Sequence, residues 1–149
     1  MRAVIQRVSR AAVLVDGTTV GAIEQGLVAL VGVAAGDGPA DLSYVASKIT
    51  ELRVFPDNDG RMNRSVAETG GAVLVVSQFT LLGDVRKGRR PAFDEAETPT
   101  VAREMYETLV ERLRQTGLQV ETGQFQAHME LELVNDGPVT IPVDSRRQF

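Results

Sequence analysis

The chain has 149 residues, of which 43% are hydrophobic and 24% are charged, and its formal net charge is -4 at pH 7. This composition is typical of a water-soluble globular protein, and we expect a single domain spanning residues 1–149. The acidic balance argues against wholesale phosphate binding, so any nucleic acid must be held locally. The lack of cysteine excludes disulfides and thiolate metal sites, and one histidine excludes a histidine cluster.

The first residues do not resemble a signal peptide. Arg2, Arg7 and Arg10 interrupt an alternating pattern, whereas a signal peptide has an unbroken apolar segment. The longest apolar run, residues 27–35, contains Gly32 and is shorter than the roughly 20 residues of a membrane span. We therefore expect a cytoplasmic protein with no membrane partner.

The chain begins with a predicted β-hairpin. Apolar runs over residues 3–8 and 11–15 predict strand, Asp16-Gly17 is typical of a tight turn, and residues 18–23 return as a second strand. Residues 27–33 then predict a central strand, in which glycine would allow another backbone to approach closely.

Two helices are predicted. The first has Asp37 as its N-cap and Pro39 in its first turn, and its apolar residues recur at helical spacing: Leu42, Val45, Ala46, Ile49 and Leu52. The second starts at Thr98-Pro99 and ends at Gly117. We expect its apolar stripe to face the core, with Val101, Ala102, Met105, Tyr106, Leu109 and Leu113.

Further short strands complete the predicted fold. Residues 53–55, 118–120 and 127–134 have strand patterns, and residues 57–60 form a turn. This acidic turn lacks the downstream glutamate that a calcium-binding loop requires. The chain is thus predicted to have an α/β fold with a mixed, largely antiparallel sheet and two main helices.

A polar segment follows the most apolar strand of the sequence. Residues 73–76 predict a strand buried on both faces, and Ser77, Gln78 and Thr80 come directly after it. A polar side chain left unpaired near a core costs about 1–3 kcal/mol. The segment is therefore either an ordinary exit from the core or a functional site.

A basic segment lies shortly after this strand. A charge run is usually a solvated face, but its position next to the polar segment favours contact with phosphate. Its four cationic residues are Arg86, Lys87, Arg89 and Arg90.

The familiar hydrolase arrangements do not fit the sequence. Only His128 could serve as the base of a triad, and Ser77 lies outside a Gly-x-Ser-x-Gly turn. The scattered carboxylates do not form a metal-binding motif. What remains is a site that acts through positioning and backbone dipoles, without a metal or cofactor.

The segment Asn135–Thr140 interrupts a strand pattern, because Pro138 removes a backbone donor and forces a bulge or turn. Together, Ser77–Asp84 and Asn135–Thr140 resemble the two signature motifs of the D-aminoacyl-tRNA deacylases. The resemblance extends in order and spacing to Met1–Val8, Arg61–Asn63, Lys87–Pro91 and Thr122-Gly123.

The resemblance implies a carboxylic ester hydrolase that removes D-amino acids from tRNA, a chiral proofreading step in translation, and also glycine mischarged on tRNA(Ala). It implies aminoacyl-tRNA as partner and no DNA. Backbone groups around Ser77, Gln78, Phe79 and Thr80 would embrace the ester, and the terminal ribose would contribute its own hydroxyl. The implied adenine contacts are Phe125 and Met129.

The resemblance also gives a role to Gly137-Pro138. We expect a cis peptide bond there, reading chirality in the partner's site of a two-fold homodimer. Thr80 is either a nucleophile or a positioning group, and we favour positioning because no base is assigned to it. Two alternatives from other classes are a non-catalytic module that binds RNA 3′ ends and a regulator that binds free amino acids.

Overall fold

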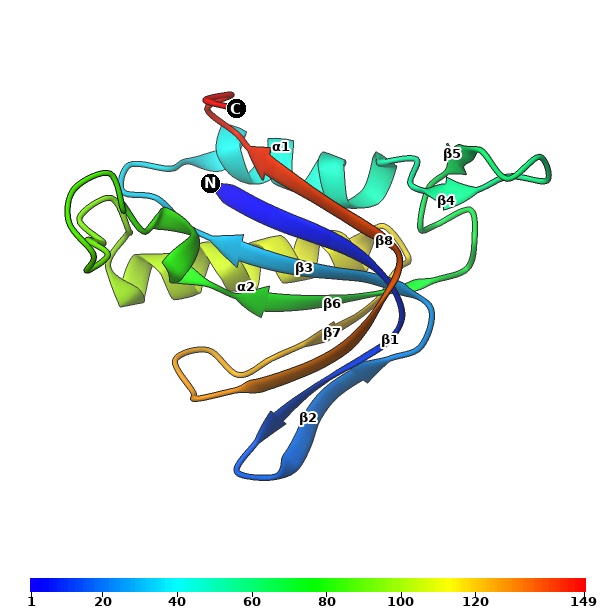
Figure 1. Ribbon diagram of the computed structural model, residues 1–149, viewed down its shortest axis with the longest axis horizontal. Helices are drawn as coiled ribbons and strands as arrows, with labels where there is room; N and C mark the ends of the chain where they lie inside the picture. Colours follow the sequence, from blue (N-terminus) through cyan, green and yellow to red (C-terminus); the bar gives the residue numbers. More distant parts are fainter.

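One mixed β-sheet forms the frame of the protein, and two long helices cover one of its faces (Figure 1). The computed structural model describes residues 1–149. Neighbouring strands follow the order β2-β1-β3-β6-β7, and β8 pairs with β1. The elements are β1 (Arg2–Val15), β2 (Thr18–Ile23), β3 (Gly26–Gly32), α1 (Pro39–Glu51), β4 (Phe55–Pro56), β5 (Met62–Arg64), β6 (Ala72–Ser77), the 3₁₀-helix η1 (Phe79–Leu82), α2 (Pro99–Gln115), β7 (Gln119–Thr122) and β8 (Glu130–Asp144).

Strand direction changes across the sheet. β1 pairs antiparallel with β2, β3 and β8, whereas β3, β6 and β7 run parallel to one another. The carboxyl ends of these three parallel strands therefore meet at one edge of the sheet, which is where ligands bind in many α/β proteins. The predicted α/β fold with a mixed, largely antiparallel sheet and two helices is confirmed.

Both helices pack against the same face of the sheet. α1 contributes Val45 and Ile49, and α2 contributes Leu109 and Leu113, to a core shared with β1, β3 and β6. Burial of one such side chain contributes roughly 1.5–3 kcal/mol, so packing rather than helix propensity holds the helices. Val101 is 40% exposed, which contradicts its predicted place in the core. Neither helix is long and apolar enough to cross a membrane.

The predicted N-cap of α1 is wrong. Gly38 is the N-cap, and its N–H donates to the carboxylate of Asp41 at 2.8 Å. Asp37 instead pairs with the N-terminal ammonium of Met1 at 2.6 Å, and both side chains are fully buried. A buried carboxylate needs a charged partner, so this distant contact, rather than helix capping, determines the role of Asp37.

The second face of the sheet is covered by the sheet itself. β1, β2 and the first part of β8 curve over it (Figure 1), and Val13, Val28 and Leu74 are buried beneath them. A Cβ atom on Gly21 would lie only 2.2 Å from the carbonyl oxygen of Thr122, so only glycine fits where β2 approaches β7.

Three predicted strands differ from the observed ones. β4 begins at Phe55 rather than residue 53 and pairs with β5 in a small arm that projects from the body (Figure 1). β7 extends to Thr122, and β8 begins at Glu130 rather than residue 127. Hydrogen bonds within the turn stabilise it, because the carboxylate of Asp57 accepts from the backbone N–H groups of Asp59 and Arg61.

β8 continues through the segment that was predicted to bulge. Its pairing with β1 shifts register around Val8, where Gln6 pairs with Thr140 and Val8 pairs with Asn135. The residues between Asn135 and Thr140 have no partner residue in β1, so the predicted bulge is confirmed.

Candidate active site

The carboxyl end of β6 leads directly into η1. The strand predicted over residues 73–76 is part of β6, which stops at Ser77, and Gln78 is the N-cap of the 3₁₀-helix. Gly32 at the end of β3 permits this turn, because a Cβ atom there would lie 2.8 Å from the carbonyl oxygen of Gln78. The prediction that a glycine allows close approach of another backbone is therefore confirmed.

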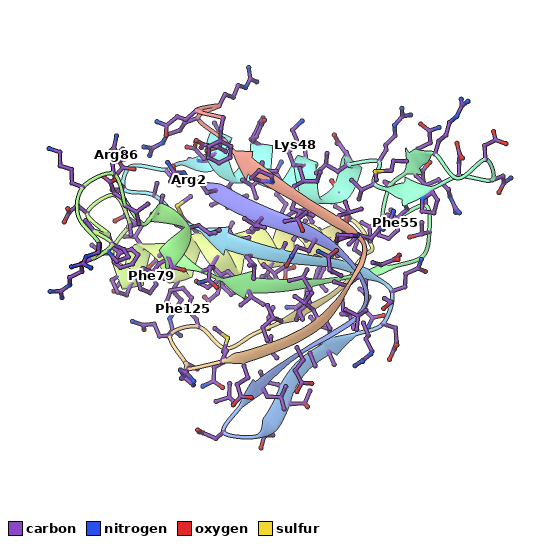
Figure 2. The ribbon with its side chains drawn as sticks, in the orientation of Figure 1. Arg2, Lys48, Phe55, Phe79, Arg86 and Phe125 are labelled. Carbon is purple, nitrogen blue, oxygen red and sulfur yellow. The ribbon has the colours of Figure 1, made fainter.

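A cavity of about 570 Å³ opens at this edge of the sheet. Figure 2 shows Phe79 and Phe125 at this end of the molecule, with Arg86 on the loop beyond them. Three segments far apart in the sequence form most of the wall, which is mainly apolar. The residues lining it are Val33, Val76, Ser77, Gln78, Phe79, Ala96, Glu97, Pro99, Ala102, Phe125, Gln126, Ala127, His128, Met129 and Leu131.

The position of the first turn of α2 explains why the prediction that Val101 faces the core is wrong. Pro99 and Ala102 line the cavity, whereas the fully buried residues of α2 begin only at Tyr106. The start of the helix therefore forms a wall of the cavity instead of packing against the core.

Thr80 lies at the edge of this site rather than in its wall. Its side chain is exposed, and its hydroxyl oxygen accepts a hydrogen bond from the side-chain amide of Gln78. His128 lines the cavity but is exposed and forms no hydrogen bond with Ser77 or Thr80. His128 therefore forms no Ser-His or Thr-His pair in this structure.

Phe125 and Met129 lie on the loop between β7 and β8. The predicted strand over residues 127–134 had included Met129. Phe125 packs against Tyr106 of α2, with ring centroids 5.9 Å apart. The hydroxyl of Tyr106 donates to the carbonyl of Val75 at 2.8 Å, and burial raises the pKa of Tyr106 to about 12. Tyr106 is therefore a core residue that supports the cavity wall, as predicted.

The basic loop, residues 84–92, closes on itself through two backbone hydrogen bonds between Asp84 and Ala92. The guanidinium of Arg86 binds the carboxylate of Asp84 at 2.7 Å, and these hydrogen bonds lower the pKa of Asp84 to about 2. Lys87, Arg89 and Arg90 are exposed and form no ion pair. The four cations therefore differ in kind: one shapes the loop and three face solvent.

The loop remains attached to the cavity through aromatic contact. Phe93, just after the loop, packs edge-on against Phe79 with ring centroids 5.0 Å apart. Such a pair contributes about 0.5–1.5 kcal/mol beyond its buried area. The basic loop is thereby held next to the wall that Phe79 forms.

Glu97 is a cavity residue that the sequence analysis missed. Backbone N–H groups of Thr98 and Gly36 donate to its carboxylate and lower its pKa, so the cavity contains an ionised acid near pH 7. The available signal was its position immediately before the Thr98-Pro99 helix start. That signal does not reveal the contact with Gly36, which lies 61 residues away.

Gly137 and Pro138 lie far from this cavity within the same chain. Val8 pairs with both Asn135 and Gly26, and Gly26 pairs with Ala72 at the start of β6. The cavity lies five residues further along β6, roughly 16 Å at the rise of a strand. The structure therefore does not bring the two signature motifs together in one chain.

The Gly137-Pro138 bond is cis, as predicted. The guanidinium of Arg7 holds the segment by donating to the carbonyls of Asp136 at 3.0 Å and Val54 at 2.6 Å. Both Gly137 and Pro138 are exposed.

Two solved structures resemble this fold. One, described as c-Myc DNA Unwinding Element Binding Protein, is 40% identical and covers 97% of this chain and 98% of its own, with a TM-score of 0.91. Another, described as a probable eukaryotic D-amino acid tRNA deacylase, covers 96% and 98% with a TM-score of 0.79. At 18% identity, this second likeness shows the fold alone.

Curated relatives match the chain over nearly its full length, and two of them are described as D-aminoacyl-tRNA deacylase. The protein from Symbiobacterium thermophilum is 60% identical and covers 100% of this chain and 99% of its own. The protein from Heliobacterium modesticaldum is 61% identical and covers 98% and 97%. The sequence profile described as D-Tyr-tRNA(Tyr) deacylase matches residues 4–144. This chain therefore belongs to the D-Tyr-tRNA(Tyr) deacylase family.

Proposed function

We propose that this protein hydrolyses the ester bond of D-aminoacyl-tRNA, releasing a free D-amino acid and tRNA. Family membership supports the reaction, and the cavity at the carboxyl end of β6 supports its location. The observation that carries the proposal is that Ser77, Gln78 and Phe79 line a mainly apolar cavity beside a cationic loop. An ester in this cavity would be shielded from water, with the tRNA backbone directed toward the loop.

Backbone amides supply the chemistry in this proposal. Phe79 and Thr80 are the first residues of η1, and the first N–H groups of a helix have no acceptor within it. Such amides can stabilise the negative charge that develops on the ester carbonyl oxygen when water attacks. An aminoacyl ester is already reactive, so positioning and charge stabilisation supply much of the required acceleration. The hydroxyl of the terminal ribose assists the attack.

Thr80 acts as a positioning group in this mechanism. A nucleophilic hydroxyl needs a base that accepts its proton. The side chain beside Thr80 is the amide of Gln78, which donates to the threonine oxygen. This hydrogen bond occupies a lone pair of the oxygen and leaves its proton free to donate to the substrate or to water.

Other residues around the cavity would bind the terminal adenine and the phosphates of the tRNA. Phe125 and Met129 would receive the terminal adenine, because an aromatic ring and a thioether suit a flat base. Lys87, Arg89 and Arg90 would bind phosphates, since they are exposed and carry no ion pair.

Chirality is read across a two-fold axis. Gly137 and Pro138 are exposed and remote from the cavity of their own chain, so they are free to enter the cavity of a second copy. There, backbone carbonyls would accept from the substrate's ammonium group, and the backbone would collide with an L side chain. Because glycine has no side chain to exclude, glycine mischarged on tRNA(Ala) would also be removed.

One assay tests the reaction. D-tyrosyl-tRNA, L-tyrosyl-tRNA and glycyl-tRNA are each incubated with the protein, and loss of the ester is followed over time. We expect rapid loss of the D and glycyl esters and retention of the L ester. Binding of tRNA without turnover would favour the RNA-binding alternative instead, and binding of free amino acids alone would favour the regulator.

Subunit complementation tests the shared site. Ala102→Trp should fill the cavity, and Gly137→Ala should disable the motif, so each variant alone should be inactive. After unfolding and refolding an equal mixture, half of the dimers are mixed, and each mixed dimer has one intact site. About one quarter of the wild-type activity should return. A mixture that stays inactive, or a monomer that is fully active, would exclude the shared site.

A further inference from the structure

Arg103 of α2 is stacked on an aromatic residue of the cavity wall. Its guanidinium carbon lies 4.9 Å from the ring centroid of Phe125, within the range of a cation–π interaction. One of its nitrogens is also 3.4 Å from the side-chain oxygen of Gln126. Arg103 therefore contacts two successive residues of the loop that carries Phe125.

This loop depends on α2 for its shape. Residues 123–129 belong to no helix or strand, and Gln126 has a φ of +63°, which is unusual for a residue other than glycine. Tyr106 contacts the same Phe125 ring from one helical turn further along α2. Arg103 and Tyr106 thus hold the ring from a rigid helix.

The two residues that contact the Phe125 ring differ in burial. Tyr106 is buried and donates to the carbonyl of Val75, so it belongs to the core. Arg103 is exposed and forms no ion pair. It lies next to Ala102, which lines the cavity. An exposed arginine adds little to the core at this position, but it contacts the Phe125 ring.

We propose that Arg103 is a positioning residue for the substrate, which holds the Phe125 ring in the orientation that receives the terminal base of the tRNA. The inference rests on the proposed function of the cavity. Arg103 does not touch the ester, so its removal should weaken substrate binding without slowing the chemical step. A planar guanidinium can stack on the ring and bind Gln126 at once, whereas the ammonium of lysine offers no planar face.

The first experiment compares Arg103→Ala, Arg103→Lys and the control Arg112→Ala with D-tyrosyl-tRNA as substrate. Arg112 lies on the same helix and is also exposed, but its guanidinium donates to the hydroxyl of Ser43 instead. We expect both Arg103 variants to raise KM about three- to tenfold with kcat nearly unchanged, and Arg112→Ala to have no effect. Full rescue by lysine, or a loss in kcat alone, would overturn the proposal.

A double-mutant cycle separates this role from a direct contact with tRNA. In a Phe125→Ala background, Arg103→Ala should cause no further rise in KM, because the ring that Arg103 holds is absent. Independent, multiplying effects of the two substitutions would show that Arg103 acts without Phe125 and would overturn the proposal.

A binding measurement keeps the inference separate from the proposed reaction. A tRNA with 2-aminopurine in place of the terminal adenine loses fluorescence when that base stacks on an aromatic ring. Wild-type protein should quench this fluorescence, and Arg103→Ala should quench it less at saturating protein. Quenching that is equal in both proteins would overturn the role of Arg103. A wild-type protein that quenches but does not hydrolyse D-tyrosyl-tRNA would overturn only the proposed function.

Discussion

The two signature segments of this protein are built in opposite ways. Ser77, Gln78 and Phe79 lie in the wall of a cavity that β6, α2 and the β7–β8 loop enclose within one chain. Gly137 and Pro138 are exposed on a bulge of β8 and do not line this cavity. One segment forms a concave site and the other a projection.

This difference shows what each segment requires of the fold. The cavity wall depends on contacts between distant parts of the chain, such as the hydrogen bond from the Gly36 N–H to the carboxylate of Glu97, 61 residues away. The projection is held by a few hydrogen bonds, including the one from the Val139 N–H to the side-chain oxygen of Asn135 at 3.0 Å and the one from the Arg7 guanidinium to the carbonyl of Asp136 at 3.0 Å. Many residues share the cavity wall, so a single substitution there should lower activity moderately. Gly137 alone permits the backbone conformation of the projection, so its substitution should lower activity strongly.

The largest effect should come from Gly137→Ala. Gly137 has a φ of +132°, and an added Cβ atom would lie 2.8 Å from a methyl group of Val139. Strain of about 1–3 kcal/mol would displace the segment, so we expect roughly a 100-fold loss of D-aminoacyl-tRNA deacylation. The control Gly60→Ala also has a positive φ but open space around it, and it should keep full activity. Equal activity of the two variants would show that the projection has no role.

A smaller effect should follow from removal of the free cations near the cavity. Replacing Lys87, Arg89 and Arg90 with alanine should weaken tRNA binding about tenfold. It should also reduce the magnitude of the slope of log K against log salt concentration by about 2. Discrimination between D and L substrates should remain, because phosphate contacts do not read the amino acid. Arg86→Ala should change the slope less, since Arg86 is paired with Asp84. A slope that the triple variant leaves unchanged would identify the loop as a solvated face.

The cavity wall should tolerate loss of a single hydroxyl. Thr80→Ala and Ser77→Ala should each reduce kcat about two- to tenfold, the effect of one lost hydrogen bond. Single-turnover hydrolysis of D-tyrosyl-tRNA measures this directly. Loss of about a millionfold, as seen when a triad nucleophile is removed, would contradict a site that acts by positioning.

The smallest effect should come from Tyr106→Phe, which changes the stability of the core next to the cavity. The pKa of Tyr106 is about 12 in the folded protein against 10.0 in its ordinary state, so its contribution to stability is complete below pH 10. That contribution is lost as pH rises through 12. Tyr106→Phe should lower stability by about 1 kcal/mol at pH 8, from the lost bond to Val75, and should flatten the alkaline decline. Urea unfolding at pH 8 and pH 11.5 measures both changes, and identical declines would contradict the assignment.

The sequence determined the features that arise from neighbouring residues. The strand at residues 73–76, both helices, the glycine at position 117 just after the end of α2 and the bulge around Pro138 were all predicted. Periodicity, turn chemistry and missing donors act over a few residues, so they are visible in a single sequence. The two motifs also identified the family, which the comparisons confirmed.

Only the tertiary structure decided how these segments meet. Asp37 was predicted to cap a helix but pairs with Met1. The carboxylate of Glu97, which lines the cavity, is held by the backbone N–H of Gly36, 61 residues away. No local pattern encodes such contacts, because burial and pairing depend on which distant groups share a low-dielectric site. For the same reason, only the register of the strands could show that the cavity and the Gly137-Pro138 projection lie apart within one chain.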